Sequence, residues 1–186
     1  MRNVNRQARS LLLLATLSSV LTPDAASALA ANLVTLQEII VAGALPPAER
    51  DAELDAARAF YDFWNTGDVA FLKRAIADDF TDHTLPPGRP QGREGPFFAS
   101  RTFRGAVPDL TVTVHKMIVA GPYVTVHMRF AGHFTGVFGT VRGDGQPVSF
   151  IATDLLKIRE GRISDNWHIE DNLTLLQQMG IAAVKK

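Results

Sequence analysis

The chain has 186 residues with 19 basic and 19 acidic side chains, and its 46% of hydrophobic residues suffice for the core of one ordinary domain. It contains no cysteine, which excludes disulfides and thiol nucleophiles. The formal charge is zero and no basic run stands out, so nucleic acid is not expected as a partner.

Residues 1–30 have the pattern of a bacterial export signal. Three arginines precede the apolar run 11–21, which is too short to cross a bilayer as a helix. Small residues follow, and both 26–28 and 28–30 fit an A-x-A cleavage site. The alternative is a core or membrane-surface helix. We expect a signal peptide over 1–30, so that the mature protein is periplasmic or secreted and keeps no stable membrane anchor.

Helical periodicity dominates the chain up to about residue 103. The Ala-rich stretch 31–45 is expected to be an N-terminal arm, either a short helix or a loose segment. Apolar residues then recur at helical spacing from Pro46 to Trp64. Gly67 is expected to end this helix and Asp68 to cap the next. The pattern then predicts a helix over 69–77, an extended segment over 79–84, a Pro/Gly-rich loop over 85–95 and a helix over 96–103.

From Pro108 onwards the hydrophobic period changes to two, as in β-strands. Glycine turns separate the alternating segments, which predict strands over 110–118, 123–130, 150–158 and 163–169, followed by a short helix over 173–179. Helices followed by an antiparallel meander predict an α+β fold for the domain over 46–182.

The alternation also assigns each side chain to a face of the sheet. It places Ile118 on the apolar face of the first strand and Met117 on the other. In the last strand it places Trp167 on the apolar face, and His168 and Glu170 opposite. The opposite face is rich in Thr and His, which suits either solvent or a subunit interface, and we expect a homodimer to use it.

Two aspartates lie in phase with the apolar face. Asp154 interrupts the apolar series of its strand, so we expect it to line a pocket, where it either organises the pocket by accepting hydrogen bonds or takes part in catalysis. Asp171 continues the phase of Trp167 beyond the last strand. Desolvation there would raise the pKa of Asp171 and suit it to proton transfer, and the alternative is an N-cap of the following helix.

The chain has five histidines, and none stands at a metal-ligand spacing. His83 follows Asp82 near the Pro/Gly-rich loop, and His133 lies where the chain is expected to bend. His115 and His127 share the parity of the Thr-rich face. The sequence also lacks a P-loop, a dinucleotide fingerprint and a G-x-S-x-G motif. We therefore expect no metal and no cofactor.

Beyond these local patterns, the chain resembles the SnoaL-like polyketide cyclases, or ester cyclases, within the nuclear transport factor 2-like superfamily that includes ketosteroid isomerase. Each marker is weak alone, but their order and spacing together indicate the family, though not a substrate. They are WNTGD at 64–68, DF at 79–80, DH at 82–83, Gly92, Gly95, PDL at 108–110, Gly132, TG at 135–136, Asp154, GRI at 161–163, Trp167, Asp171 and LQQMG at 176–180. The resemblance implies a cone-shaped α+β barrel. In such a barrel, N-terminal helices pack on a curved antiparallel or mixed sheet and enclose an apolar pocket, often in a dimer.

The resemblance also implies site residues. The family's acid/base aspartate matches Asp171, and a polar pocket residue falls at His83. A pocket histidine of the cyclases has no counterpart here, where Asp154 and Lys157 stand on the same strand. We expect the catalytic residues to be Asp171, His83, His133 and Asp154, and the pocket wall to include Trp64, Phe98, Met128, Phe134 and Trp167.

The leading hypothesis is a cofactor-independent cyclase or isomerase acting on a small apolar carbonyl compound. Asp171 would transfer protons in an intramolecular aldol-type ring closure, and His83 with His133 would donate hydrogen bonds to the enolate oxygen. The alternative is a non-catalytic periplasmic protein that binds a small molecule in the same pocket. Epoxide hydrolysis ranks last, because Arg129 is expected to face away from the pocket.

Overall fold

The computed structural model describes residues 33–183, and the predicted signal peptide lies outside them. After the N-terminal arm come helices α2 (Pro47–Thr66) and α3 (Val69–Ala75), then strand β3 (Ile76–Asp82) and helix α4 (Glu94–Ala106). The long strands follow in order, and the short helix α5 (Asn172–Gln178) comes last. This order confirms the predicted α+β class.

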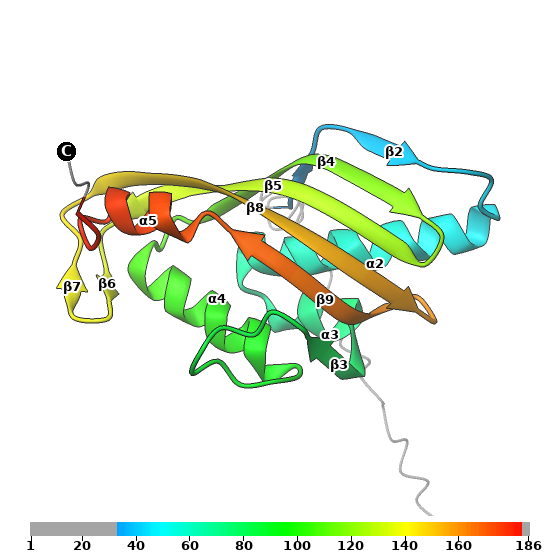
Figure 1. Ribbon diagram of the computed structural model, residues 1–186, viewed down its shortest axis with the longest axis horizontal. Coiled ribbons are helices and arrows are strands. Elements are labelled where there is room, and N and C mark those ends of the chain that lie inside the picture. Colours follow the sequence, from blue (N-terminus) through cyan, green and yellow to red (C-terminus); the bar gives the residue numbers. More distant parts are fainter. Residues whose placement is uncertain (1–32, 184–186) are drawn as a thin grey trace, which may run out of the picture. The chain divides into compact units, whose positions relative to one another are not determined.

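One mixed sheet forms the centre of the domain. Strands β4 (Thr111–Ala120), β5 (Tyr123–Phe134), β8 (Gln146–Arg159) and β9 (Arg162–Glu170) form an antiparallel meander, and β3 pairs parallel with β9. Helices α2, α3 and α4 all lie on one face of this sheet (Figure 1). The sheet formed by the described strands is open, with β3 at one edge.

The N-terminal arm adds strands and not the short helix considered above. Strands β1 (Thr35–Leu36) and β2 (Ile39–Val41) both pair parallel with β4. A separate hairpin, β6 (Val137–Phe138) with β7 (Val141–Arg142), extends between β5 and β8. In the described part of the chain, no helix is both long enough and apolar enough to cross a membrane.

The helix ends follow the predicted capping chemistry. Helix α2 starts at Pro47, where a missing N–H costs nothing, and ends where Gly67 turns left-handed at φ 77° and donates its N–H to the Phe63 carbonyl. The Asp68 carboxylate accepts from the Ala70 N–H at 2.8 Å and starts α3. The sharp turn between α2 and α3 is thus written locally in the sequence.

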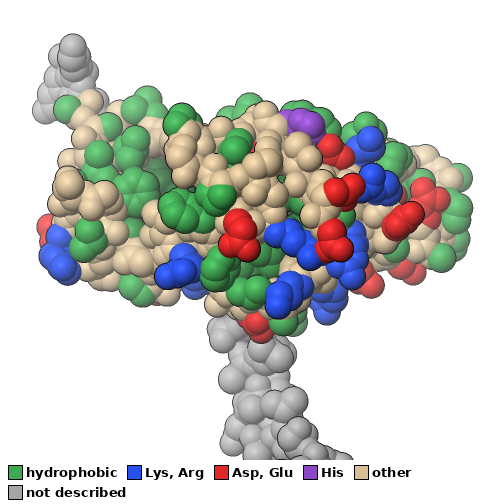
Figure 2. All heavy atoms as spheres, turned by 90° about the horizontal axis from the view of Figure 1, so that it is seen from below, with side chains coloured by type: hydrophobic (Ala, Val, Ile, Leu, Met, Phe, Trp, Pro, Cys, Tyr) green, Lys and Arg blue, Asp and Glu red, His purple; other side chains and the backbone are tan. Residues whose placement is uncertain are grey.

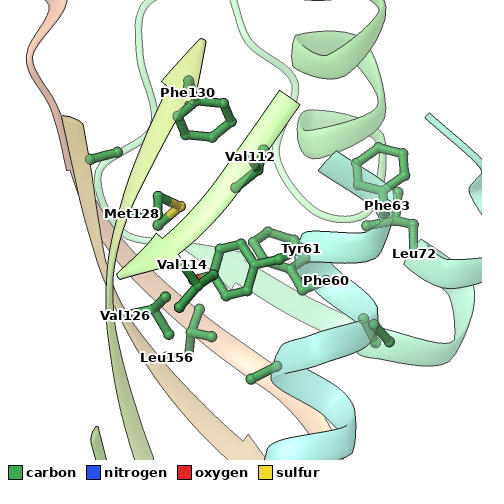
Figure 3. Close-up of a cluster of buried hydrophobic side chains, with 14 of the residues drawn as sticks. Phe60, Tyr61, Phe63, Leu72, Val112, Val114, Val126, Met128, Phe130 and Leu156 are labelled. Carbon is green, nitrogen blue, oxygen red and sulfur yellow. The ribbon is translucent and has the colours of Figure 1, made fainter. Parts of the chain in front are cut away.

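The main core lies between α2 and the sheet. Phe60, Tyr61 and Phe63 are fully or almost fully buried. Phe60 and Tyr61 point from α2 towards apolar side chains of the strands, and Phe63 lies beside Leu72 of α3 (Figure 3). The strand side of this cluster is supplied by Val112, Val114, Val126, Met128, Phe130 and Leu156. Because these side chains stand at alternate positions on three neighbouring strands, burying α2 against them also fixes the register of the sheet.

Two β-bulges change the faces that strict alternation assigns. In β4 the register shifts between Val114 and Lys116, so Met117 is buried and Ile118 is 37% exposed, the reverse of the prediction. In β9 the register shifts beside Ser164, which leaves Ile163 and Ser164 both buried. A bulge inserts one unpaired residue and inverts the parity of the strand beyond it. From Ser164 onwards, therefore, the even-numbered residues of β9 face the helices.

The face of the domain that bears β3 and α4 carries charges of both signs, intermixed (Figure 2). Arg159 pairs with Asp79 at 2.5 Å, and Arg93 pairs with Asp78 nearby. The opposite face of the sheet, away from α2, α3 and α4, is semi-polar, with Ile151 and Leu155 more than a third exposed beside a His127–Thr153 hydrogen bond. The use of that face by a homodimer stays a prediction.

Neighbouring leucines of β8 test this assignment of faces. Leu156 is fully buried, so Leu156→Ala should lower the free energy of unfolding by about 2–5 kcal/mol, because it removes contacts and leaves a cavity. Leu155 faces outwards, and Leu155→Ala should cost less than about 1 kcal/mol. Urea denaturation of both variants measures the difference, and equal losses would contradict the predicted register.

Candidate active site

A cavity opens between the helices and the covered face of the sheet. About 560 Å³ of space free of protein atoms lies between the residues that line it, and this figure includes open solvent at its mouth. Most of its wall is apolar and aromatic: Phe60, Trp64, Phe80, Pro96, Phe103, Met128, Phe130, Phe150 and Ala152. Its polar side chains are Asp82, Arg89, Asp154, Asn166, His168 and Glu170. An apolar cavity with a few convergent polar groups is typical of a small-molecule site.

Asp154 lies on β8 with its carboxyl buried in this cavity. The Tyr61 hydroxyl donates a 2.7 Å hydrogen bond to Oδ2 of Asp154. Burial raises the pKa of Asp154 from 3.8 to about 7, although the Tyr61 hydrogen bond and the positive charge of His168 pull it down. Asp154 is therefore a carboxyl group that can gain or lose a proton near neutral pH.

His168 lies directly opposite Asp154 in the sheet and is held between two carboxylates. Its Nε2 is 3.0 Å from Asp82 Oδ2, and its Nδ1 is 2.8 Å from Glu170 Oε1. The Glu170 contact is an ion pair out of line with the N–H, since Nδ1 makes no hydrogen bond in the described structure. Burial opposes the charge, but the two carboxylates prevail and raise the pKa of His168 to about 10.

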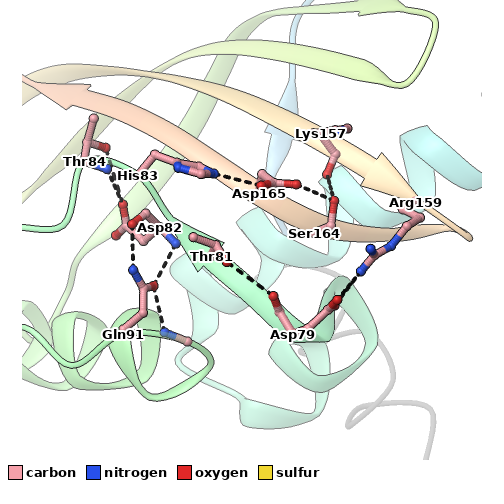
Figure 4. Close-up of polar contacts among 11 residues, drawn as sticks. Asp79, Thr81, Asp82, His83, Thr84, Gln91, Lys157, Arg159, Ser164 and Asp165 are labelled. Carbon is pink, nitrogen blue, oxygen red and sulfur yellow. Dashed lines mark hydrogen bonds and ion pairs between the residues drawn. The ribbon is translucent and has the colours of Figure 1, made fainter.

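Asp82 is the fixed partner of this imidazolium. Its Oδ1 accepts from the Thr84 N–H at 2.9 Å, and its backbone exchanges hydrogen bonds with the Gln91 side chain (Figure 4). Burial would raise the pKa of Asp82, but His168 and Thr84 hold it below its ordinary value. His168 similarly outweighs the burial of Glu170 and lowers its pKa. At neutral pH the group formed by Asp82, His168 and Glu170 is therefore fully ionised.

Asp171 does not line the cavity. It is the N-cap of α5, where its carboxylate accepts from the Thr174 N–H at 3.1 Å and from the Thr174 hydroxyl at 2.6 Å. These hydrogen bonds lower the pKa of Asp171, so the predicted upward shift is wrong. The N-cap alternative is confirmed, and the catalytic role of Asp171 stays a prediction that this geometry does not favour.

His83 and Trp167 lie on the side of β9 that faces away from the cavity. Their rings stack at 4.3 Å, and His83 Nε2 is 2.8 Å from Asp165 Oδ1 (Figure 4). The predicted place of Trp167 in the pocket wall is wrong, because the bulge beside Ser164 turns the odd-numbered residues of β9 outwards. His83 alternates with Asp82, and it is Asp82 that enters the cavity.

Three other predicted residues also lie outside the cavity. His133 is more than half exposed and pairs with Asp109 at 2.7 Å. Phe98 is 51% exposed on the outer side of α4. Phe134 is fully buried but belongs to the core near the β6–β7 hairpin. By contrast, Trp64, Met128 and Asp154 do line the cavity as predicted.

Sequence reasoning missed the polar cavity residues Asp82, Arg89, Asn166, His168 and Glu170. A signal for Asp82 was present, because Asp82 follows the buried Phe80 at the two-residue spacing of a strand. For the three β9 residues strict alternation predicted the outer face of the sheet, because it did not take the bulge beside Ser164 into account. Their faces follow from the register with β8, which only the folded sheet defines.

The fold and cavity can now be compared with known proteins. The sequence profile of the SnoaL-like polyketide cyclases matches residues 54–179. A proposed polyketide cyclase from Bacillus cereus ATCC 10987 is 35% identical, with a TM-score of 0.74 over 81% of this chain and 95% of that one. IdmH from Streptomyces antibioticus, also a proposed polyketide cyclase, is 30% identical, with a TM-score of 0.62 over 69% of this chain and 98% of that one. TsrD from Streptomyces laurentii, 24% identical, shares the fold with a TM-score of 0.65 over 75% of this chain and 100% of that one. None of the curated proteins matches the chain.

The protein belongs to the SnoaL-like polyketide cyclase family, with the nuclear transport factor 2-like fold. The resemblance noted in the sequence is thereby confirmed. Membership supports a function of the cyclase or isomerase type.

The Tyr61–Asp154 hydrogen bond can be tested by stability. Tyr61→Phe leaves a buried acceptor without its donor, so it should cost about 1–3 kcal/mol. The loss should be larger at pH 8.5 than at pH 5, because Asp154 is ionised only above its pKa of about 7. Urea denaturation at both pH values measures it. Tyr123→Phe is the control, since that side chain is 39% exposed, and it should change little at either pH.

His168 predicts how stability depends on pH. Below pH 6.5 the ring is protonated in both the folded and the unfolded chain, and its stabilisation is complete. Between pH 6.5 and 10 the unfolded chain loses the proton while the folded protein keeps it, so the unfolding free energy should fall as pH rises. Denaturation at pH 6.5, 8 and 9.5 follows the decline. In Asp82→Asn the NMR signals of the His168 ring should titrate at lower pH, and a ring that is neutral at pH 8 in the wild type would refute the assignment.

Proposed function

We propose that this protein is a cofactor-independent cyclase or isomerase in which Asp154 transfers protons inside the apolar cavity. The observation that carries the proposal is the state of the Asp154 carboxyl, which is buried, lines the cavity and has a pKa of about 7. General acid–base catalysis is most effective with a pKa near the working pH, because both protonation states are then available. The sequence favoured Asp171 for this role, but Asp171 has a lowered pKa and lies outside the cavity wall.

The two carboxyl oxygens of Asp154 support different tasks. Oδ2 accepts from Tyr61, which fixes the orientation of the carboxyl group. Oδ1 makes no hydrogen bond within residues 33–183 and is not sealed from the cavity. A carboxyl held by one oxygen and free at the other is well placed to take a proton from a bound molecule.

Ionised Asp154 would remove a proton from the carbon next to a carbonyl group, and the electron pair of the broken C–H bond would form an enolate. In a cyclase the enolate carbon attacks a second carbonyl carbon of the same molecule and forms a C–C bond. The resulting alkoxide then takes the proton back from Asp154. In an isomerase the proton returns to a different carbon. Both reactions return Asp154 to its ionised form and require no oxidant or reductant.

The charges around Asp154 favour a neutral substrate. Asp82 and Glu170 are negative, and His168 and Arg89 balance them. A charged substrate would disturb this balance in a poorly solvated site, which is costly. The remaining wall is largely aromatic, and Phe130 stacks on Phe150 at 5.2 Å. We therefore propose an apolar, ring-forming or cyclic carbonyl compound as the substrate class.

Proton exchange on a generic ketone tests the proposal before the substrate is known. The wild-type protein should accelerate deuterium exchange at the activated carbon of 2-tetralone, a neutral bicyclic ketone, as followed by proton NMR in D₂O. Asp154→Asn should reduce the protein-dependent rate by about 100-fold or more, because it removes the base.

Asp171→Asn provides the matched comparison. The cap is replaced by another good capping residue, so the fold should persist. Exchange that survives in Asp171→Asn but disappears in Asp154→Asn would support Asp154, and the opposite pattern would return the role to Asp171. Saturable binding of 2-tetralone without any exchange by the wild type would instead indicate a binding protein.

A further inference from the structure

Asn166 carries the only side-chain amide in the described wall of the cavity, and this amide makes no hydrogen bond in the described structure. It is 5% exposed and lines the cavity from β9. Its Oδ1 is buried and makes no hydrogen bond, and no hydrogen bond is made by its side-chain nitrogen either. Buried polar groups are normally paired, so an unpaired one in a binding cavity calls for an explanation.

The position of Asn166 relates it directly to Asp154. Asn166 lies opposite Leu156 in the pairing of β9 with β8, and the next inward residue of β9, His168, lies opposite Asp154. Asn166 and Asp154 are therefore diagonal neighbours on the same face of the sheet. The Cα atoms of such a pair are about 7–8 Å apart. A gap of this size between two short side chains suits a carbonyl group and its adjacent carbon.

The chemistry of the two groups is complementary. The Asn166 amide nitrogen is the side of the group left open, and it is a neutral donor. The nearby imidazolium of His168 forms ion pairs with Asp82 and Glu170. Its Nε2 is held by Asp82 and its Nδ1 is buried, so neither nitrogen is open to a ligand. Within the described cavity wall, Asn166 is thus the donor closest in the sheet to Asp154 that no other side chain occupies.

We propose that Asn166 is a specificity-determining residue that binds the carbonyl oxygen of the substrate and places the adjacent carbon against Asp154. This inference rests on the proposed function and adds the group that orients the substrate. A site built to hydrogen-bond a carbonyl rejects analogues that lack it, because its polar groups then stay unpaired. The protein should accordingly prefer ketones to hydrocarbons of the same shape.

Binding of carbonyl-labelled 2-tetralone tests this role. In the wild-type complex the C=O stretching band should shift to lower frequency than in an apolar solvent, because a hydrogen bond weakens the C=O bond. Asn166→Leu should abolish that shift and raise the Kd about tenfold, the equivalent of one hydrogen bond. Infrared spectroscopy and calorimetric titration measure the two effects. Asn172→Leu, the same change at an exposed residue, is the control and should alter neither.

Stability separates substrate binding from a structural role. Because Oδ1 of Asn166 is buried without a partner, Asn166→Leu should leave the Tm unchanged or raise it. An unchanged Kd and band position in Asn166→Leu, or a wild-type protein that does not bind 2-tetralone saturably, would overturn the proposal. A lowered Tm with the band shift retained would overturn it too. Failure of the proposed function reads differently, as an intact Asn166-dependent band shift with no deuterium exchange in the wild type.

Discussion

The packing of α2 against the sheet supports the rest of this domain. Phe60 and Tyr61 bury one side of the helix against the strands, and Phe60 also forms part of the cavity wall. Tyr61 links the two regions, since its ring is fully buried in the core and its hydroxyl donates to Asp154. The orientation of the candidate catalytic carboxyl therefore depends on the same contacts that stabilise the fold.

The apolar surroundings explain the arrangement of the polar groups. In a poorly solvated site an ionised side chain must be paired, and the cavity pairs His168 with Asp82 and Glu170. Asp154 is the exception, because its hydrogen-bond partner is the neutral Tyr61. Asp82, His168 and Glu170 consequently stay ionised at neutral pH, whereas the pKa of Asp154 lies near 7. One environment thus produces both a fixed electrostatic frame and a group able to exchange protons.

Much of the architecture was predictable from local patterns. The helix with Pro47 and Gly67 at its ends, the Asp68 cap and the strands followed from propensity and period. The apolar series of β8 placed Asp154 in a pocket, and the family resemblance led to Trp64 and Met128 as part of the cavity wall. The motif around Asp171 served as a family marker, yet the side chain it contains caps a helix. A motif can therefore identify a family without showing which way each of its side chains points.

The sequence by itself determined the main helices and the long strands, their order, the resemblance to the family and the inward-facing carboxyl of Asp154. The tertiary structure alone decided whether the odd-numbered or the even-numbered residues of β9 face the cavity. The phase of a strand follows from alternation only while every residue is paired, and the bulge beside Ser164 breaks that condition. Which residue of β9 stays unpaired depends on the register with β8, and a pattern within β9 alone does not contain that register. That single offset exchanges Trp167 for Asn166, His168 and Glu170, and so determines the chemistry of the site.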